Sequence, residues 1–271
     1  MAEEFKGKNA KNPELLNSKK LFVLDMDGTF YLGERLIPGS LDFIRKLEQT
    51  GKGFLFFTNN SSKISSFYSQ KLASMGCRVE DASIVTSGDV TIKYLQEKRP
   101  GKKIYLLGTE LLRNSFTKSG IALEENSPDI VVIAFDTSLT YERISLACKY
   151  IRNGAEFIAT HPDLNCPTED GFIPDCGAMC AMITASTGVK PRYLGKPYGE
   201  TIEMIRRITG MKNEDIVFVG DRLYTDIAIG VNHGVTSILV LSGETAPEDL
   251  KLSEIQPDFV FSSLAALGNI L

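Results

Sequence analysis

The segment Asp-Met-Asp-Gly-Thr at residues 25–29 combines residue types that could do chemistry. It directly follows the apolar run at 21–24, and on an extended chain Asp25 and Asp27 point to the same side. Two carboxylates held close together repel each other unless a cation or a shared proton relieves the repulsion. Gly28 permits a turn and a close approach of the backbone to a ligand. The segment therefore indicates a ligand site, although Asp and Gly are also common where a strand ends in an ordinary loop.

A second polar cluster, formed by Thr58, Asn59 and Asn60, follows the apolar run at 54–57. Hydroxyl and amide side chains at such a point can cap the next helix, and free backbone amides at a helix start bind anions. Taken alone, the cluster is better explained by an ordinary helix cap. Its position at the end of another apolar run favours a ligand site.

A third cluster follows the apolar run at 216–219 and contains Asp221, Arg222, Thr225 and Asp226. Asp221 at the end of the run is a natural oxygen ligand, and Asp226 could orient such ligands from behind. An acidic residue at the start of a helix is also favoured by the helix dipole alone.

Lys196 lies in a Gly-Lys-Pro segment before a helical pattern at 201–208. Its ammonium would supply one compact positive charge, which suits a phosphate oxygen. A single lysine is more often solvated at the surface, so this segment indicates a function only together with the other clusters.

The sequence pattern also predicts the scaffold that positions these clusters. Short apolar runs at 21–24, 54–57, 216–219 and 238–241 are typical of strands buried on both faces of a parallel sheet. Helical spacing between them, for example at 41–47, predicts a doubly wound α/β fold. Because the carboxyl ends of parallel strands share one edge, we expect the three clusters and the lysine to converge. Carboxylates together with a phosphate form the oxygen environment that Mg²⁺ prefers.

The middle of the chain repeats the alternation on its own scale. Strand-like runs occur at 104–107, 130–135 and 157–159, and helical spacing occurs at 141–151. The stretch between the second cluster and the lysine is far longer than a connecting loop of about 2 to 6 residues. It therefore has room for a separate domain.

In their order and positions, the clusters resemble the four motifs of the haloacid-dehalogenase-like superfamily, and within it the para-nitrophenylphosphatase and NagD-type phosphatases with a class II cap. The resemblance spans about residues 20–245 and includes further similar sequence segments at 159–163, 175–178 and 195–197. Met26 stands where such proteins commonly carry Leu or Ile, a swap that conserves apolar volume.

This resemblance implies a Rossmann-like doubly wound core interrupted by an inserted α/β cap. The implied catalytic core comprises residues 1–88 and 190–271, and the implied cap comprises residues 89–189. A homodimer through the cap is plausible from family likeness alone.

The resemblance also implies the roles of individual residues. Asp25 would be the nucleophile that forms an aspartyl-phosphate, and Asp27 would act as general acid and then as general base. Mg²⁺ would be held by Asp25, Asp27 and Asp221, with Asp27 also lending its backbone carbonyl. The other implied site residues are Gly28, Thr58, Asn59, Asn60, Lys196 and His161 for phosphate or substrate, supported by Asp226, Arg222 and Thr225.

His161 lies in a loop at 161–165 that we expect to contact the substrate, although a loop histidine satisfied by water is the alternative. Cys176 and Cys180, four residues apart on an expected helix, lack the fourth ligand of a zinc site, so we expect them in a core. His233 before a glycine is expected at a helix end.

Composition narrows the function classes. The 271 residues carry a net charge of -4 without a basic segment, which disfavours nucleic-acid binding. No apolar run approaches the roughly 18 to 20 residues of a membrane span, so we expect no membrane insertion. Five cysteines and the absence of a secretory segment after Met1 predict a cytoplasmic protein. Residues 1–20 match no motif.

We therefore expect an Mg²⁺-dependent phosphatase of small phosphomonoesters, such as nucleotide phosphates, sugar phosphates or p-nitrophenyl phosphate. The alternatives are a receiver-type signalling module phosphorylated on aspartate and a phosphomutase of the same superfamily. A receiver domain has about 120 residues and lacks the second aspartate, and a dehalogenase of this superfamily would need neither Mg²⁺ nor that acid. Dinucleotide, nucleotide-triphosphate and serine-esterase fingerprints are absent from the sequence.

Overall fold

The computed structural model describes residues 12–168 and 171–271, which form two compact units. The first unit comprises the described residues up to Phe57, Ser69–Val85 and Ile202–Leu271; the second comprises Thr58–Tyr68 and Thr86–Thr201. The division into a core at 1–88 and 190–271 and a cap at 89–189 stays a prediction from the sequence.

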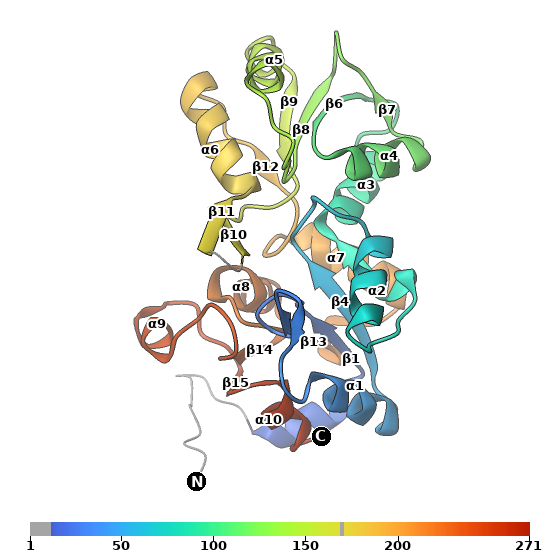
Figure 1. Cartoon of the computed structure of the whole chain (residues 1–271), viewed down its shortest axis with the longest axis vertical. Helices are drawn as coiled ribbons and strands as arrows, with labels where there is room; N and C mark the ends of the chain where they lie inside the picture. Colours follow the sequence, from blue (N-terminus) through green and yellow to red (C-terminus); the bar gives the residue numbers. More distant parts are fainter. Residues whose placement is uncertain (1–11, 169–170) are drawn as a thin grey trace. The chain divides into compact units, whose positions relative to one another are not determined.

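The first unit is built on a six-stranded sheet (Figure 1). Its strands are β1 (Leu21–Leu24), β4 (Gly53–Thr58), β5 (Ile84–Thr86), β13 (Ile216–Gly220), β14 (Thr236–Val240) and β15 (Phe259–Phe261). They lie in the order β15-β14-β13-β1-β4-β5, and the pairs β1–β13, β1–β4, β13–β14 and β14–β15 are parallel. If the six strands are numbered 1 to 6 along the sequence and read from the β5 edge, their order is 3-2-1-4-5-6. This is the order of a Rossmann-like fold. The predicted fold class is confirmed.

The order of the strands reverses between β1 and β13, and this is where ligands bind in open α/β sheets. Every residue of both strands is buried, which explains their wholly apolar or glycine sequences. Leu24 pairs with Val219 at the carboxyl ends, and the Asp25 amide continues the ladder to the Val219 carbonyl at 2.9 Å. The residues after β1 and β13 therefore leave the sheet side by side.

The helices associated with the first unit are α1 (Ser40–Gln49), α2 (Ser65–Ser74), α7 (Gly199–Thr209), α8 (Ala228–His233), α9 (Pro247–Leu252) and α10 (Leu264–Gly268), of which α2 and α7 begin in segments of the second unit. Short 3-10 turns span Pro13–Ser18, Asp81–Ser83 and Asn213–Asp215, and a π-type turn spans Leu223–Ile227. Helix α1 packs on α10 and, through Phe43, on Phe22 of β1, with ring centroids 6.0 Å apart. His233 ends α8 before Gly234, as expected.

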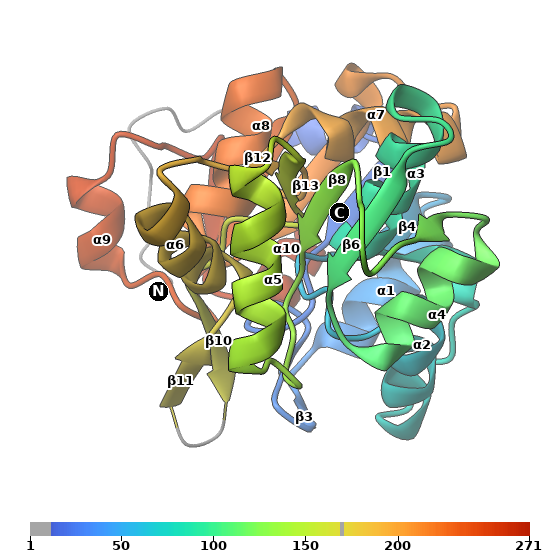
Figure 2. The same cartoon turned by 90° about the horizontal axis from the view of Figure 1, so that it is seen from above.

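The second unit has a five-stranded sheet in the order β12-β9-β8-β6-β7. Its strands are β6 (Lys103–Leu107), β7 (Ala122–Leu123), β8 (Ile130–Ile133), β9 (Glu156–Ala159) and β12 (Arg192–Tyr193), and its helices are α3 (Ser87–Lys98), α4 (Glu110–Lys118), α5 (Tyr141–Arg152) and α6 (Cys176–Thr187). All strand pairs of this five-stranded sheet are parallel. Helices α5 and α6 pack together on one face, and Figure 2 shows α3 and α4 on the other.

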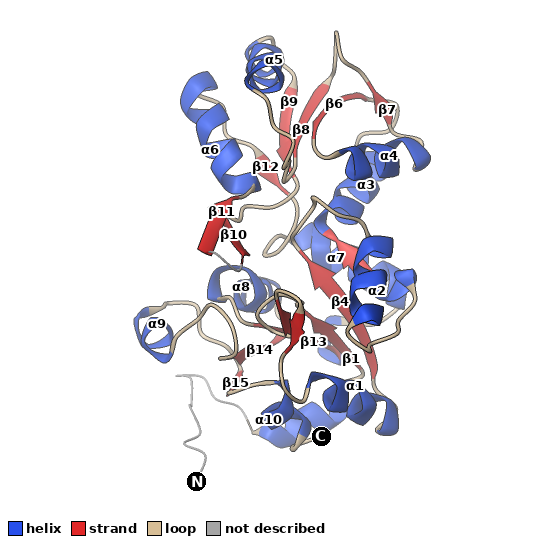
Figure 3. Ribbon diagram, in the orientation of Figure 1, coloured by secondary structure: helices blue, strands red, loops and turns tan. Residues whose placement is uncertain are grey.

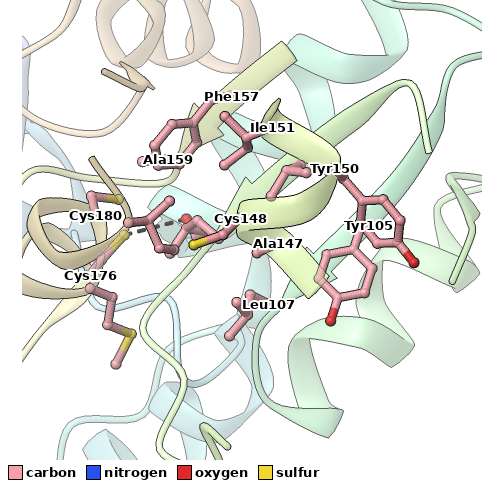
Figure 4. Close-up of a cluster of buried hydrophobic side chains, with 14 of the residues drawn as sticks. Tyr105, Leu107, Ala147, Cys148, Tyr150, Ile151, Phe157, Ala159, Cys176 and Cys180 are labelled. Carbon is pink, nitrogen blue, oxygen red and sulfur yellow. Dashed lines mark hydrogen bonds between the residues drawn. The ribbon is translucent and has the colours of Figure 1, made fainter. Parts of the chain in front are cut away.

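The core between this sheet and α5 and α6 is drawn in Figure 4. It includes Cys148, Cys176 and Cys180, which behave there as small apolar side chains, as predicted for the last two. All cysteines of the chain are unbridged.

Among the described residues, each unit also contains a separate antiparallel pair of short strands, of which β10–β11 is labelled in Figure 3. Strands β2 (Tyr31–Leu32) and β3 (Arg35–Leu36) follow the Asp-Met-Asp-Gly-Thr segment in the first unit. Strands β10 (Asn165–Thr168) and β11 (Gly171–Pro174) precede α6 in the second unit. Among the described residues, none of the helices has the length and hydropathy of a membrane-crossing segment.

Candidate active site

Three carboxylates of the first unit gather where the strand order reverses. Asp25, Asp221 and Asp226 each offer an oxygen, and these oxygens all lie within 4.8 Å of one another. Asp25 follows β1, Asp221 follows β13, and Asp226 comes from the π-type turn after it. Such a concentration of negative charge suits a hard divalent cation, which takes oxygen ligands.

Asp221 is fixed by its neighbours on both carboxylate oxygens. The Thr29 hydroxyl donates to Oδ1 at 3.2 Å, and the Glu244 amide donates to Oδ2 at 2.7 Å. The Thr245 hydroxyl donates to the Asp221 carbonyl, which fixes the backbone as well. Burial, reinforced by the charge of Asp226, raises the pKa of Asp221 to about 7. A bound cation would reverse this effect because it favours the ionised carboxylate.

Gly28 is required for the close approach of two chain segments at Asp221. Its φ of +88° lies in the left-handed region, and a Cβ at this position would be 2.4 Å from Asp221 Oδ2. Gly243 faces the same carboxylate, where a Cβ would be 2.0 Å from Oδ2. The backbone at Gly28 and Gly243 therefore lies directly against the Asp221 carboxylate.

Asp226 lies next to this carboxylate, and Arg222 follows Asp221 in the chain. The Arg222 amide donates to Asp226 Oδ2 at 3.1 Å, and the Arg222 side chain pairs with Glu244 at 2.9 Å. A Cβ on Gly220 would be 2.2 Å from Asp226 Cγ, so only glycine fits there. Thr225 is buried in the same turn.

Asp27 is partly buried, and its carboxylate does not belong to the cluster of Asp25, Asp221 and Asp226. Burial raises its pKa, against the opposing charges of Lys71 and Arg222. A raised pKa suits a group that must give up a proton near neutral pH. The implied role of its backbone carbonyl as a metal ligand stays a prediction.

Lys71 was not identified from the sequence, since it lies on α2, far from any motif. Its ammonium is 4.3 Å from the ring centroid of Tyr31 and 3.4 Å from a Glu34 oxygen, so it holds the hairpin that follows Asp27. Thr29, Glu244 and Thr245 were likewise given no role, and only the folded structure brings the latter two to Asp221.

The second unit contains the remaining predicted residues, and hydrogen bonds link Asn59 with Lys196 and Asn60 with Thr58. The Asn59 side chain joins the main chain of Lys196 through two hydrogen bonds of 2.8 and 3.0 Å. The Asn60 amide donates to the Thr58 hydroxyl at 3.1 Å, and Asn60 Oδ1 accepts from Ser62. Lys196 is only 2% exposed, which sets it apart from an ordinary solvated lysine.

His161 is fully buried in the second unit, with Nε2 at 2.9 Å from Asp175 Oδ1. Burial alone lowers its pKa, but the charges of Asp175, Cys176 and Asp163 outweigh burial and raise the pKa to about 9. No role was predicted for Asp163 or Asp175, although both lie in the segments 159–163 and 175–178 that resemble the superfamily. The substrate contact of His161 stays a prediction.

The predicted residues therefore fall into two sets. Asp25, Asp27, Gly28, Asp221, Arg222, Thr225 and Asp226 belong to the first unit, and Thr58, Asn59, Asn60, His161 and Lys196 belong to the second. The structure brings members of each set together, and the convergence of both sets on one phosphoryl group stays a prediction.

Comparisons with known proteins agree with this architecture. A family model described as haloacid dehalogenase-like hydrolase matches residues 22–122, and a second model of hydrolases of this kind matches residues 193–267. The acid sugar phosphatase of Staphylococcus aureus strain MRSA252 is 37% identical over 248 residues, covering 90% of this chain and 95% of the relative.

Solved structures of similar proteins cover nearly the whole chain. A 4-nitrophenylphosphatase from Thermotoga maritima superposes with a TM-score of 0.91 at 48% identity, covering 94% of this chain and 98% of the other. NagD from E. coli K-12 superposes with a TM-score of 0.85 at 32% identity, covering 91% and 97%.

Proposed function

The chain belongs to the haloacid dehalogenase-like hydrolase family, and we propose that it is an Mg²⁺-dependent phosphatase working through an aspartyl-phosphate. The observation that carries this proposal is the gathering of the Asp25, Asp221 and Asp226 oxygens within 4.8 Å at the point where the strand order reverses. Relatives named as phosphatases cover nearly the whole chain, which supports hydrolysis of a phosphate ester.

The donor set fits a divalent metal. Asp25, Asp221 and the Asp27 backbone carbonyl would hold the ion, and Asp226 would stand behind them. Oxygen ligands with one or two carboxylates are the set that Mg²⁺ prefers. When bound, the ion would neutralise charge on the phosphoryl group and keep Asp221 ionised.

In the first half-reaction, an Asp25 carboxylate oxygen attacks phosphorus and the bond to the leaving oxygen breaks. Asp27 gives its proton to that oxygen, so an alcohol leaves and Asp25 carries the phosphoryl group. The raised pKa of Asp27 fits a carboxyl that starts in the protonated state.

In the second half-reaction, water attacks the same phosphorus and Asp27 takes its proton. The bond to the Asp25 oxygen breaks, which releases inorganic phosphate and restores the carboxylate. Lys196, Thr58, Asn60 and the backbone amide of Asn59 would hold the phosphoryl oxygens through both steps, because positioning and charge neutralisation dominate phosphoryl transfer.

The printed names of the relatives guide the choice of substrate. Since they include an acid sugar phosphatase and a 4-nitrophenylphosphatase, we propose sugar phosphates and p-nitrophenyl phosphate as substrates. Family membership along the chain supports this proposal over a receiver-type module. The homodimer through the cap and the cytoplasmic location stay predictions.

The test is the turnover of p-nitrophenyl phosphate with and without Mg²⁺ by the wild-type protein and Asp25→Asn. We expect turnover only with the metal and only by the wild type, while exposed Asp42→Asn behaves like the wild type. Wild-type turnover by Asp25→Asn would exclude Asp25 as the nucleophile. Full turnover after chelation would exclude a requirement for the metal.

A further inference from the structure

The Asn59 side chain and the Lys196 main chain form a reciprocal hydrogen-bonded pair. The Lys196 amide donates to Asn59 Oδ1 at 2.8 Å, and Asn59 Nδ2 donates to the Lys196 carbonyl at 3.0 Å. Nδ2 also donates to Asp163 Oδ1 at 3.1 Å. Because the backbone amide can only donate while the carbonyl and the carboxylate can only accept, these partners dictate the orientation of the side-chain amide. Asn59 therefore ties the segment after β4 to the segment that carries Lys196.

Asp163 is itself part of a buried polar cluster with His161 and Asp175. Ligand-type atoms of the three residues lie within 4.8 Å of one another, and the residues are 2%, 0% and 3% exposed, respectively. His161 Nε2 faces Asp175 Oδ1 at 2.9 Å, while Nδ1 lies 2.9 Å from the Thr160 hydroxyl. Since Nε2 and Asp163 Oδ1 are engaged with Asp175 and Asn59, the arrangement favours a hydrogen-bonded cluster over a metal site.

Charge explains why these groups tolerate burial together. Two buried carboxylates would repel each other strongly, and an imidazolium between them offsets that repulsion. Asp175 also caps α6, where its Oδ1 accepts from the Cys176 amide at 2.6 Å. The cluster is therefore anchored to a helix of twelve residues, which makes it a rigid support for Asp163.

The chain segments around the cluster pack so closely that there is no space for a side chain at Gly195 or Gly177. A Cβ on Gly195 would lie 2.6 Å from Asn59 Oδ1 and 2.7 Å from the Thr160 carbonyl. A Cβ on Gly177 would lie 2.1 Å from the Pro162 carbonyl. With so little space between the segments, a displacement of the cluster must be passed on to Asn59 and to the segment of Lys196.

We propose that Asp163, supported by the buried His161–Asp175 pair, is a positioning residue for phosphate binding: it holds Asn59, and through it the Lys196 segment, in the geometry that receives the phosphoryl group. This inference rests on the proposed function, in which Asn59 and Lys196 hold phosphate. It assigns His161 to the support of these residues in place of the direct substrate contact expected from the sequence.

The test compares Asp163→Ala and Asp163→Asn with the wild type, and Asp136→Asn serves as the matched control. Asp136 is equally buried in the same unit, and its side chain pairs with Arg143 at 2.6 Å and accepts hydrogen bonds from Ser138 instead of from a residue of the cluster. KM and kcat are measured with p-nitrophenyl phosphate and with a sugar phosphate, and the affinity for inorganic phosphate is measured by calorimetry. Thermal unfolding reports the stability of each variant.

We expect Asp163→Ala to weaken inorganic phosphate binding and to raise both KM values by about tenfold or more, as when a charged hydrogen-bond partner is lost. The factor is the same for both esters, because the effect acts on the phosphate and not on the leaving group. Asp163→Asn restores most of the affinity, since its amide oxygen still accepts from Asn59. Asp136→Asn leaves phosphate affinity unchanged.

Unchanged phosphate affinity in Asp163→Ala would overturn the proposal, as would a loss that differs between the two esters or that Asp136→Asn reproduces. If Asp163→Ala does not fold, Asp163→Ser replaces it, because its hydroxyl keeps the position polar but is too short to reach Asn59. A wild-type protein without turnover would refute the proposed function instead, and its phosphate affinity would still test the positioning of Asn59.

Discussion

Mg²⁺ is expected to stabilise the protein far more at alkaline than at acidic pH, because the raised pKa of its proposed ligand Asp221 means that a proton must leave before the ion can bind at low pH. Burial, with the charge of Asp226, raises the pKa of Asp221 from 3.8 to about 7. Between these two values the folded state binds a proton that the unfolded state has lost. The free energy of unfolding without metal therefore falls as pH rises across this window, by about 4 kcal/mol from this group.

A divalent cation binds the ionised carboxylate and so offsets this loss in the free energy of unfolding. Below about pH 5 the cation must displace a proton, whereas at about pH 8 the site is already ionised. At a concentration of 100 times its dissociation constant, the ion adds about 2.7 kcal/mol to the free energy of unfolding at the higher pH. For a chain of this size, that corresponds to a rise of roughly 5 to 10 °C in the unfolding midpoint.

The assay is thermal unfolding followed by circular dichroism across this pH range, with and without Mg²⁺. The matched variant is Asp221→Asn, which keeps the shape of the side chain and removes its titration, so it should lose the part of the pH dependence that Asp221 contributes and the response to Mg²⁺. A shift of equal size at both ends of the range, or one that persists in Asp221→Asn, would refute the reasoning.

Three further changes test individual parts of the account. Gly28→Ala places a methyl group 2.4 Å from the Asp221 carboxylate at a φ of +88°, so it should weaken Mg²⁺ binding by at least about tenfold in calorimetry; unchanged binding would contradict the close approach. Lys196→Ala should lower kcat/KM about 10²-fold to 10³-fold for every phosphate ester, and an effect on one ester alone would argue against phosphate binding. Asp27→Asn should lower kcat/KM, which reports the first half-reaction, about 10²-fold to 10⁴-fold for a sugar phosphate and less for p-nitrophenyl phosphate, whose leaving group hardly needs a proton. Equal losses for the two esters would argue against Asp27 as the acid.

The sequence predicted the strands of both sheets where burial on both faces enforces a wholly apolar run. The runs at 21–24 and 216–219 became β1 and β13 with almost the same limits, and the helix expected at 141–151 is α5. Hairpins with strands of two residues, such as β2–β3, escaped prediction because their pairing depends on a turn and not on periodicity.

The candidate site was predictable where each residue follows a core strand, as Asp25, Thr58 and Asp221 do. Residues that reach the site through tertiary packing left no local pattern, and Lys71 on α2 is one example. The burial of His161 was also hidden, because a histidine in a polar loop gives no sign of the aspartates that will surround it. The roles proposed for Asp163 and Asp175 follow only from their distances to His161 and Asn59, which the sequence does not reveal.

The central claim is that both sets of residues meet on one phosphoryl group, and a crystal structure with Mg²⁺ and trifluoroberyllate tests it most directly. We predict beryllium attached to an Asp25 carboxylate oxygen, with Mg²⁺ held by Asp25, Asp221 and the Asp27 carbonyl. We also predict the Lys196 ammonium within hydrogen-bonding distance of a fluorine. A fluoride complex bound away from Asp25, or held there without Lys196, would contradict it.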